Sequence, residues 1–121
     1  MATIYEQLGG EDAIHAAVVI FYGRVLSDRR VARFFAGLDM DQQIAKQRAF
    51  MTLAFGGPST YSGRQMRAAH APLVARGLSD EHFDAVVEHL GATLREMGVR
   101  EALVAEVLDA VGATRADVLG R

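Results

Sequence analysis

Apolar residues recur at helical intervals along most of this chain. In the segment from Glu11 to Leu26 they repeat at i, i+3, i+4 and i+7, and two later segments, from Ser79 to Met97 and from about Arg100 onward, repeat them similarly. That spacing places apolar side chains on one face of a helix. The expected inward residues are Ile14, Ala17, Val18, Phe21, Tyr22 and Val25, then Phe83, Val86, Val87, Leu90, Leu94 and Met97, then Leu103, Val104, Val107, Leu108 and Val111. The pattern predicts three amphipathic helices.

A fourth helix is expected from about Met40 to Phe55. Asp39 is placed to cap its N-terminus, with Gln42 three residues further on as in a capping box. Gly56-Gly57-Pro58 ends this helix, because glycine tolerates a left-handed cap and proline cannot continue the helix. The stretch from Pro58 to Gly63 has little periodicity and is expected to be a loop.

The remaining elements are short or weakly patterned. A short segment from Asp28 to about Ala36 carries two adjacent aromatic residues, and a weaker helix is expected from about Arg64 to Val74 in spite of Pro72. Ser79-Asp80-Glu81 is suited to the N-terminus of the helix that follows it. Helices are expected to be interrupted at Gly9-Gly10, Gly77, Gly98 and Gly112. The chain is therefore predicted to be one all-α domain over residues 1–121.

Composition narrows the classes of function. The 121 residues are 50% hydrophobic, which is enough for a core, and the absence of cysteine excludes disulfides, zinc–thiolate sites and iron–sulfur clusters. The net charge of −2 is spread along the chain without a basic block, which argues against nucleic-acid or membrane-surface binding. The first residues lack the pattern of a signal peptide, and no apolar run is long enough to span a bilayer. We expect a cytoplasmic protein with no membrane partner.

Polar side chains interrupt the apolar stripe of the helix expected from Met40 to Phe55. Gln47 lies within the stripe, Gln43 precedes it by one turn, and Lys46 borders the same face. Tyr22 likewise occupies a core-facing position of its own helix. A buried amide without a partner costs about 1–3 kcal/mol, so these groups either bond to each other and to backbone, or line a binding site. Both interpretations are open at this point.

Histidine is the other candidate for chemistry. No two of the four histidines are spaced i, i+4, so a helix-borne zinc chelate is not indicated. His15 lies on the polar edge of its helix, and His82 and His89 are expected at the surface or rim. His70 differs, because its neighbours along the helix are apolar or small. Taken alone it is still more typical of a packed histidine than of a ligand.

One kind of site unites these features. A haem pocket needs one axial imidazole, apolar and aromatic side chains over the macrocycle, and a few hydrogen-bond donors toward a bound gas. His70 opposite a helix that bears glutamines, with Tyr22 nearby, is suited to such a pocket. Spacing alone indicates this arrangement without establishing it.

The chain resembles the group I truncated (two-on-two) haemoglobins over nearly its whole length. The runs Phe-Gly-Gly-Pro and Gly-Arg-x-Met-x-x-x-His, in this order and spacing, are the most specific part of this resemblance. The segments that carry it are Tyr5-Glu6-Gln7-Leu8-Gly9-Gly10, Phe21-Tyr22-Gly23-Arg24-Val25-Leu26, Phe34-Phe35-Ala36, Ala49-Phe50, Ala54-Phe55-Gly56-Gly57-Pro58, Tyr61-Ser62-Gly63-Arg64, Met66-Arg67-Ala68-Ala69-His70 and His82-Phe83-Asp84.

The resemblance implies a two-over-two helical sandwich around haem b. It implies that His70 is the proximal iron ligand and that Tyr22, Gln43 and Gln47 form the distal cluster that stabilises a bound gas. Phe35 matches the aromatic that stacks on the haem, and Arg64 is suited to a haem propionate. The remaining residues expected at the haem are Phe34, Lys46, Phe50 and Met66, with Phe50 and Met51 along an apolar route for gases.

The resemblance also implies a function. We expect a monomer that binds O2, NO and CO reversibly, for oxygen transport or for nitric oxide detoxification by dioxygenation to nitrate. The second use requires a reductase, which the sequence does not identify. Some relatives link a histidine of the last helix to the haem, whereas Thr114-Arg115-Ala116-Asp117 contains none, so the haem is expected to be held without a covalent bond.

Lys46 leaves an alternative open. It is the chain's only lysine and directly precedes Gln47. At the position of Lys46, several family members carry a histidine that binds iron as a sixth ligand. A neutral lysine can bind iron, whereas arginine stays protonated. The alternative function is a six-coordinate haem protein in electron transfer or in redox or gas sensing. Lys46 can instead point outward, away from the iron. A further alternative for the whole chain is a haem-free helical interaction module.

Overall fold

The computed structural model describes residues 3–57 and 63–121, which form helices joined by short turns. The helices are α1 (Ile4–Leu8), α2 (Glu11–Leu26), α3 (Arg29–Ala32), the 3₁₀ turn η1 (Arg33–Phe35), α4 (Met40–Ala54), α5 (Gly63–Ala75), α6 (Asp80–Glu96), α7 (Glu101–Gly112) and α8 (Arg115–Leu119). This order confirms the all-α prediction and the helix bounds to within a residue or two. The predicted loop lies largely outside the described residues.

Local signals in the sequence explain where the helices begin and end. Asp39 accepts hydrogen bonds from the backbone of Asp41 and Gln42, which caps α4 as expected. Gly56 ends that helix at φ +82°, a left-handed conformation that glycine adopts without strain. Gly57 is needed for a different reason, since a Cβ there would lie 2.6 Å from the Tyr5 ring. The two glycines thus let α1 pack against the end of α4.

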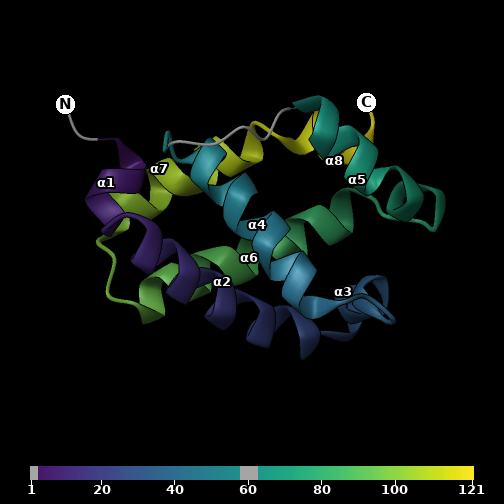
Figure 1. Cartoon of the computed structure of the whole chain (residues 1–121), viewed down its shortest axis with the longest axis horizontal. Helices are drawn as coiled ribbons and strands as arrows, with labels where there is room; N and C mark the ends of the chain where they lie inside the picture. Colours follow the sequence, from purple (N-terminus) through teal and green to yellow (C-terminus); the bar gives the residue numbers. More distant parts are fainter. Residues whose placement is uncertain (1–2, 58–62) are drawn as a thin grey trace.

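The long helices form two crossing layers. α4 packs on α2, α6 packs on both α2 and α7, and α2 and α4 pass in front of α6 in Figure 1. Their apolar faces meet in one core, in which Ile14, Val18, Phe21, Val25, Met51, Leu94, Val104 and Val107 are almost completely buried. Within the described ranges, no helix is both long and apolar enough to span a membrane.

α5 lies apart from this stack. It packs chiefly on the short helix α8, and the two lie side by side near the C-terminus in Figure 1. Met66 of α5 and Val118 and Leu119 of α8 are buried and join the common core. The space between α5 and α4 is therefore left for a site.

Asp28 connects the start of α3 to α6. Its carboxylate accepts from the Arg30 backbone at 2.9 Å, which caps α3, and it contacts His89 Nε2 at 2.7 Å. Hydrogen bonds from Arg30, together with that of His89, hold the pKa of Asp28 far below its ordinary value. His89 is half-buried by this contact, in keeping with the rim position expected for it.

Candidate functional site

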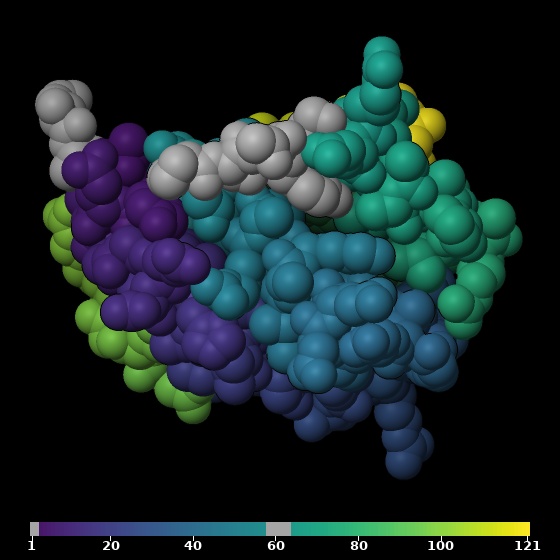
Figure 2. Space-filling view, viewed as in Figure 1, coloured from purple at the N-terminus to yellow at the C-terminus, as the bar shows by residue number. Residues whose placement is uncertain are grey.

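A cavity of about 320 Å³ lies between α4 and α5 and reaches inward to α2 and α6. This volume falls within the roughly 300–1,000 Å³ usual for ligand and cofactor sites. α4 and α5 lie next to each other on the side of the molecule shown in Figure 2. The apolar lining comes from Phe21, Val31, Phe34, Phe35, Leu38, Phe50, Leu73, Leu78, Phe83, Val86, Leu90, Val111 and Val118. No carboxylate is among the lining residues that the structure describes.

His70 enters the cavity from α5. Its Nδ1 lies 2.8 Å from the Met66 carbonyl oxygen, one turn earlier on the same helix. Because a carbonyl only accepts, Nδ1 carries the proton and the lone pair is on Nε2. Burial lowers the pKa of the imidazole, and the hydrogen bond to Met66 offsets part of that shift. The ring is therefore neutral near pH 7 and has Nε2 available as a ligand.

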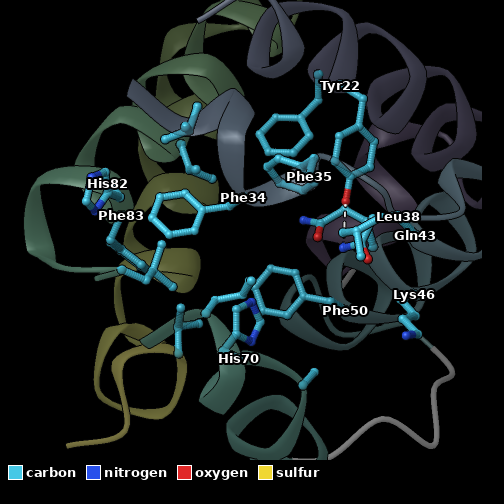
Figure 3. Close-up of a pocket in the computed structure, with 18 of the residues that line it drawn as sticks. Tyr22, Phe34, Phe35, Leu38, Gln43, Lys46, Phe50, His70, His82 and Phe83 are labelled. Carbon is cyan, nitrogen blue, oxygen red and sulfur yellow. Dashed lines mark hydrogen bonds between the residues drawn. The ribbon is translucent and has the colours of Figure 1, made fainter. Parts of the chain in front are cut away.

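The polar groups expected on the distal side come together. Tyr22 is almost completely buried, and its hydroxyl oxygen accepts a hydrogen bond of 3.2 Å from the Gln43 side-chain amide. The close-up in Figure 3 shows this pair on the side of the cavity away from His70. Gln47, one turn after Gln43 on α4, also lines the cavity and is half-buried. An apolar cavity thus holds an imidazole on one wall and hydrogen-bonding groups on the other.

Aromatic rings line the cavity between the two walls. The Phe35 ring packs edge-on against Tyr22 with centroids 5.5 Å apart, and Phe34 is buried beside it. Phe50 of α4 lies next to His70 in Figure 3. All three expected aromatics line the cavity. A flat ligand would be covered by ring faces and edges rather than by polar groups.

The opening of the cavity is positively charged. Lys46 on α4 and Arg76, directly after the end of α5, both line the cavity, and both are exposed. Arg76 Nη2 donates to the Arg33 carbonyl oxygen at 3.3 Å, which ties this side of the opening to η1. Arg64, which the sequence analysis expected at a propionate, is exposed and does not line the cavity. Sequence reasoning missed Arg76, since no motif distinguishes it from the other arginines.

The structure places Met66 and His82 differently from the sequence analysis. Met66 does not line the cavity; its side chain is buried in the core, and its carbonyl oxygen is bonded to His70. The prediction that His82 lies at the surface or rim is wrong. His82 is 8% exposed, lines the cavity and packs edge-on against Phe34 at 4.9 Å. Its Nδ1 accepts from the Ser79 backbone at 3.0 Å, so the capping of α6 turns the ring inward.

The described residues contain no group of three or more histidine, aspartate or glutamate side chains that could hold a bare metal ion. A metal in this cavity would have to bring most of its ligands with it, as the iron of a porphyrin does. Comparison with known proteins agrees with that reading. The family model for bacterial-like globins matches residues 3–119. A group 1 truncated haemoglobin of Synechocystis sp. is 55% identical over 124 residues, 100% of both chains. The chain belongs to the truncated haemoglobins.

Relatives of this truncated haemoglobin cover its full length. The solved 2/2 haemoglobin of Synechococcus sp. PCC 7002, in the cyanomet state and with covalently attached haem, is 51% identical with a TM-score of 0.92, covering 99% of this chain and 100% of its own. These likenesses confirm the two-over-two fold.

The truncated haemoglobin of Tetrahymena pyriformis, solved in its Fe(III) form, is 47% identical with a TM-score of 0.89, covering 99% of this chain and 100% of its own. Solved variants of that protein change one tyrosine and, separately, two glutamines. Those three positions have the same spacing along its chain as Tyr22, Gln43 and Gln47 have here.

Haem b is the cofactor of this family, and the cavity fits it. A macrocycle needs an apolar, aromatic slot, and the lining supplies one without a carboxylate to bury. Its iron needs a neutral imidazole, and His70 is held in the required tautomer. Its two carboxylates need cations at the opening, where Lys46 and Arg76 lie.

Proposed function

We propose that this truncated haemoglobin binds haem b through His70 Nε2 and reversibly binds a diatomic gas on the opposite face. The observation that carries the proposal is the cavity with His70, bonded through Nδ1 to Met66, on one wall and the Tyr22–Gln43 pair on the other. The haem supplies the iron that the gas binds. The protein supplies the axial imidazole, the exclusion of water and the distal hydrogen bonds.

The distal residues favour oxygen among such gases. A hydroxyl and two amides inside an apolar cavity interact most strongly with a ligand that acquires negative charge. Matching spacing with the Tetrahymena residues chosen for substitution supports a role for Tyr22, Gln43 and Gln47 in that interaction. Tight oxygen binding favours reaction over delivery, so we propose nitric oxide dioxygenation as the use and oxygen transport as the alternative. NO and O2 form nitrate with one electron, which a reductase must supply.

A direct experiment tests both parts of this proposal. Addition of one equivalent of haem to the purified chain is expected to give a Soret band of a histidine-ligated haem, and rapid mixing of the oxygenated protein with NO is expected to give one nitrate per haem. Absence of the Soret band would overturn the haem assignment. Haem binding without nitrate formation would leave oxygen transport as the function. We expect a cytoplasmic monomer in either case.

Lys46 carries the alternative proposal of a six-coordinate haem. It lines the cavity on α4 directly before Gln47, although its side chain is exposed at the edge of the group drawn in Figure 3. In that state Lys46 would have to turn inward and lose its proton, and it would leave before oxygen binds. Electron transfer or redox or gas sensing would then be the function.

Spectra of the ferric protein decide between these states of Lys46. If Lys46 is the sixth ligand, the wild type is low-spin at the upper end of a titration from about pH 6 to pH 10, because the amine binds iron only when deprotonated. The variant Lys46→Ala is then high-spin at the same pH. Arg95→Ala is a matched control, since it removes an exposed cation of α6 that does not line the cavity. A wild type that stays high-spin throughout contradicts the alternative.

A further inference from the structure

α5, the helix that carries His70, lies between the cavity and α8. α5 has the cavity on one side, and its main packing partner is α8. The buried apolar side chains of these two helices are Met66 on α5 and Val118 and Leu119 on α8. Tertiary contacts hold such a helix in place, and polar contacts between the two helices add to this apolar packing.

Charged side chains supply those contacts. Arg67 of α5 donates through Nε to Asp117 of α8 at 2.9 Å and through Nη2 to the main-chain oxygen of Arg121 at 2.7 Å. The Arg121 guanidinium in turn donates to both carboxylate oxygens of Asp80 on α6, at 3.0 and 2.6 Å. Arg121 therefore joins α5 to α6, because its main-chain oxygen accepts from Arg67 of α5 and its guanidinium donates to Asp80 of α6.

Arg115 completes the network from α8. Its guanidinium donates to Asp80 at 2.9 Å and also pairs with Asp84, and it lies 4.5 Å from the centre of the Phe83 ring, which lines the cavity. Hydrogen bonds from Arg121 and then Arg115 lower the pKa of Asp80, so this carboxylate stays ionised well below neutral pH. We call Arg67, Asp80, Asp84, Arg115, Asp117 and Arg121 together the α8 clasp.

The network matters because of the way His70 is attached to α5. The imidazole is bonded through Nδ1 to the Met66 carbonyl at 2.8 Å, so the ring is fixed relative to its own helix. Arg67, the residue next to Met66, is the anchor of α5 in the α8 clasp. Any shift of α5 against α8 therefore carries the imidazole with it.

We propose that the α8 clasp positions α5, and through it His70, at the haem iron. Arg67, Asp117 and Arg121 are then positioning residues rather than ligands. This inference rests on the proposed ligation by His70. A single exposed ion pair contributes little to stability, whereas a network shared by three helices holds them against independent movement. Because the pairs are exposed, salt weakens the clasp.

Charge reversal of Arg67 in the haem-loaded protein tests the proposal. For Arg67→Asp we expect amide hydrogen exchange in α5 and haem transfer to excess apomyoglobin to accelerate about tenfold, a change of about 1.4 kcal/mol. The iron–histidine stretching frequency of the ferrous protein should shift as well. The double variant Arg67→Asp/Asp117→Arg restores the pair with reversed charges and should bring all three readouts back toward wild type.

A matched control separates the clasp from surface charge in general. Arg95 of α6 pairs with Glu101 at 2.9 Å and is similarly exposed, but it lies outside the α8 clasp. Arg95→Asp should leave α5 exchange and the iron–histidine stretch unchanged. Should Arg67→Asp fail to fold, Asp117→Asn removes the same pair without reversing a charge.

The results have distinct meanings. The inference is overturned if Arg67→Asp or Asp117→Asn leaves α5 exchange and the stretching frequency as in wild type, or if Arg95→Asp changes them equally. Failure of the proposed function looks different, because the wild-type chain would then show no Soret band. Exchange in α5 of the haem-free chain, compared between wild type and Arg67→Asp, still tests the clasp in that event.

Discussion

Replacing His70 by glycine is expected to cost this truncated haemoglobin its stable ferrous haem complex. We propose Nε2 of the neutral His70 as the iron ligand, because Nδ1 is bonded to the Met66 carbonyl oxygen. Loss of an outer-shell partner alone costs about 10- to 100-fold in metal affinity, so loss of the ligand itself should weaken haem binding by more than about 100-fold. Haem transfer to excess apomyoglobin measures this change.

Added imidazole makes the His70 experiment specific. Glycine leaves a space beside α5 in which free imidazole can bind iron, so the wild-type spectrum should return as imidazole is added to His70→Gly. His15→Gly is the matched control, because His15 is exposed on α2 and does not line the cavity. A His70→Gly protein that keeps the wild-type spectrum without imidazole would show that another residue is the ligand.

Tyr22→Phe is expected to accelerate oxygen dissociation by about 10- to 100-fold. The substitution removes the buried hydroxyl that points into the cavity beside Gln43, while the ring and its packing on Phe35 remain. A hydrogen bond to a charged group contributes about 1.5–3 kcal/mol, and each 1.4 kcal/mol is a factor of ten. Stopped-flow displacement of oxygen by carbon monoxide gives the rate.

The coupling between Tyr22 and Gln43 can be measured in the same assay. Because their side chains share a hydrogen bond of 3.2 Å, the effects of Tyr22→Phe and Gln43→Leu should not add in the double variant. Tyr5→Phe is the control, since Tyr5 lies in α1 and does not line the cavity. An oxygen dissociation rate that Tyr22→Phe leaves unchanged would contradict the distal role proposed for this residue.

Local sequence signals predicted most of the secondary structure. The expected start and end of α2, at Glu11 and Leu26, are those of the structure, and the break expected at Gly112 separates α7 from α8. Glycine and N-cap residues act through the backbone of their own turn, so their effect does not depend on the rest of the fold. The short segment after Asp28 was harder to interpret, because α3 and η1 together make only two turns.

The site was predicted in part. Tyr22 and Gln43 were expected on core faces from helical spacing alone, and the structure brings them into contact. His70 was distinguished from the other histidines by its apolar neighbours and by the family motif. His82 was misplaced, because sequence position put it in the first turn of a helix without showing that Phe34 packs over it. Arg76 was missed for the same reason, since the opening of the cavity exists only once α5 faces α4.

The sequence by itself determined the helices, their ends, the core-facing stripes and the motif that contains His70. These properties depend on interactions between residues three or four positions apart, which periodicity records directly. The tertiary structure alone decided which charges meet, and so placed Arg76 at the cavity and built the α8 clasp from three helices. Contacts between residues far apart in the chain depend on how whole helices pack, and exposed arginines carry no local mark of the partner they will have.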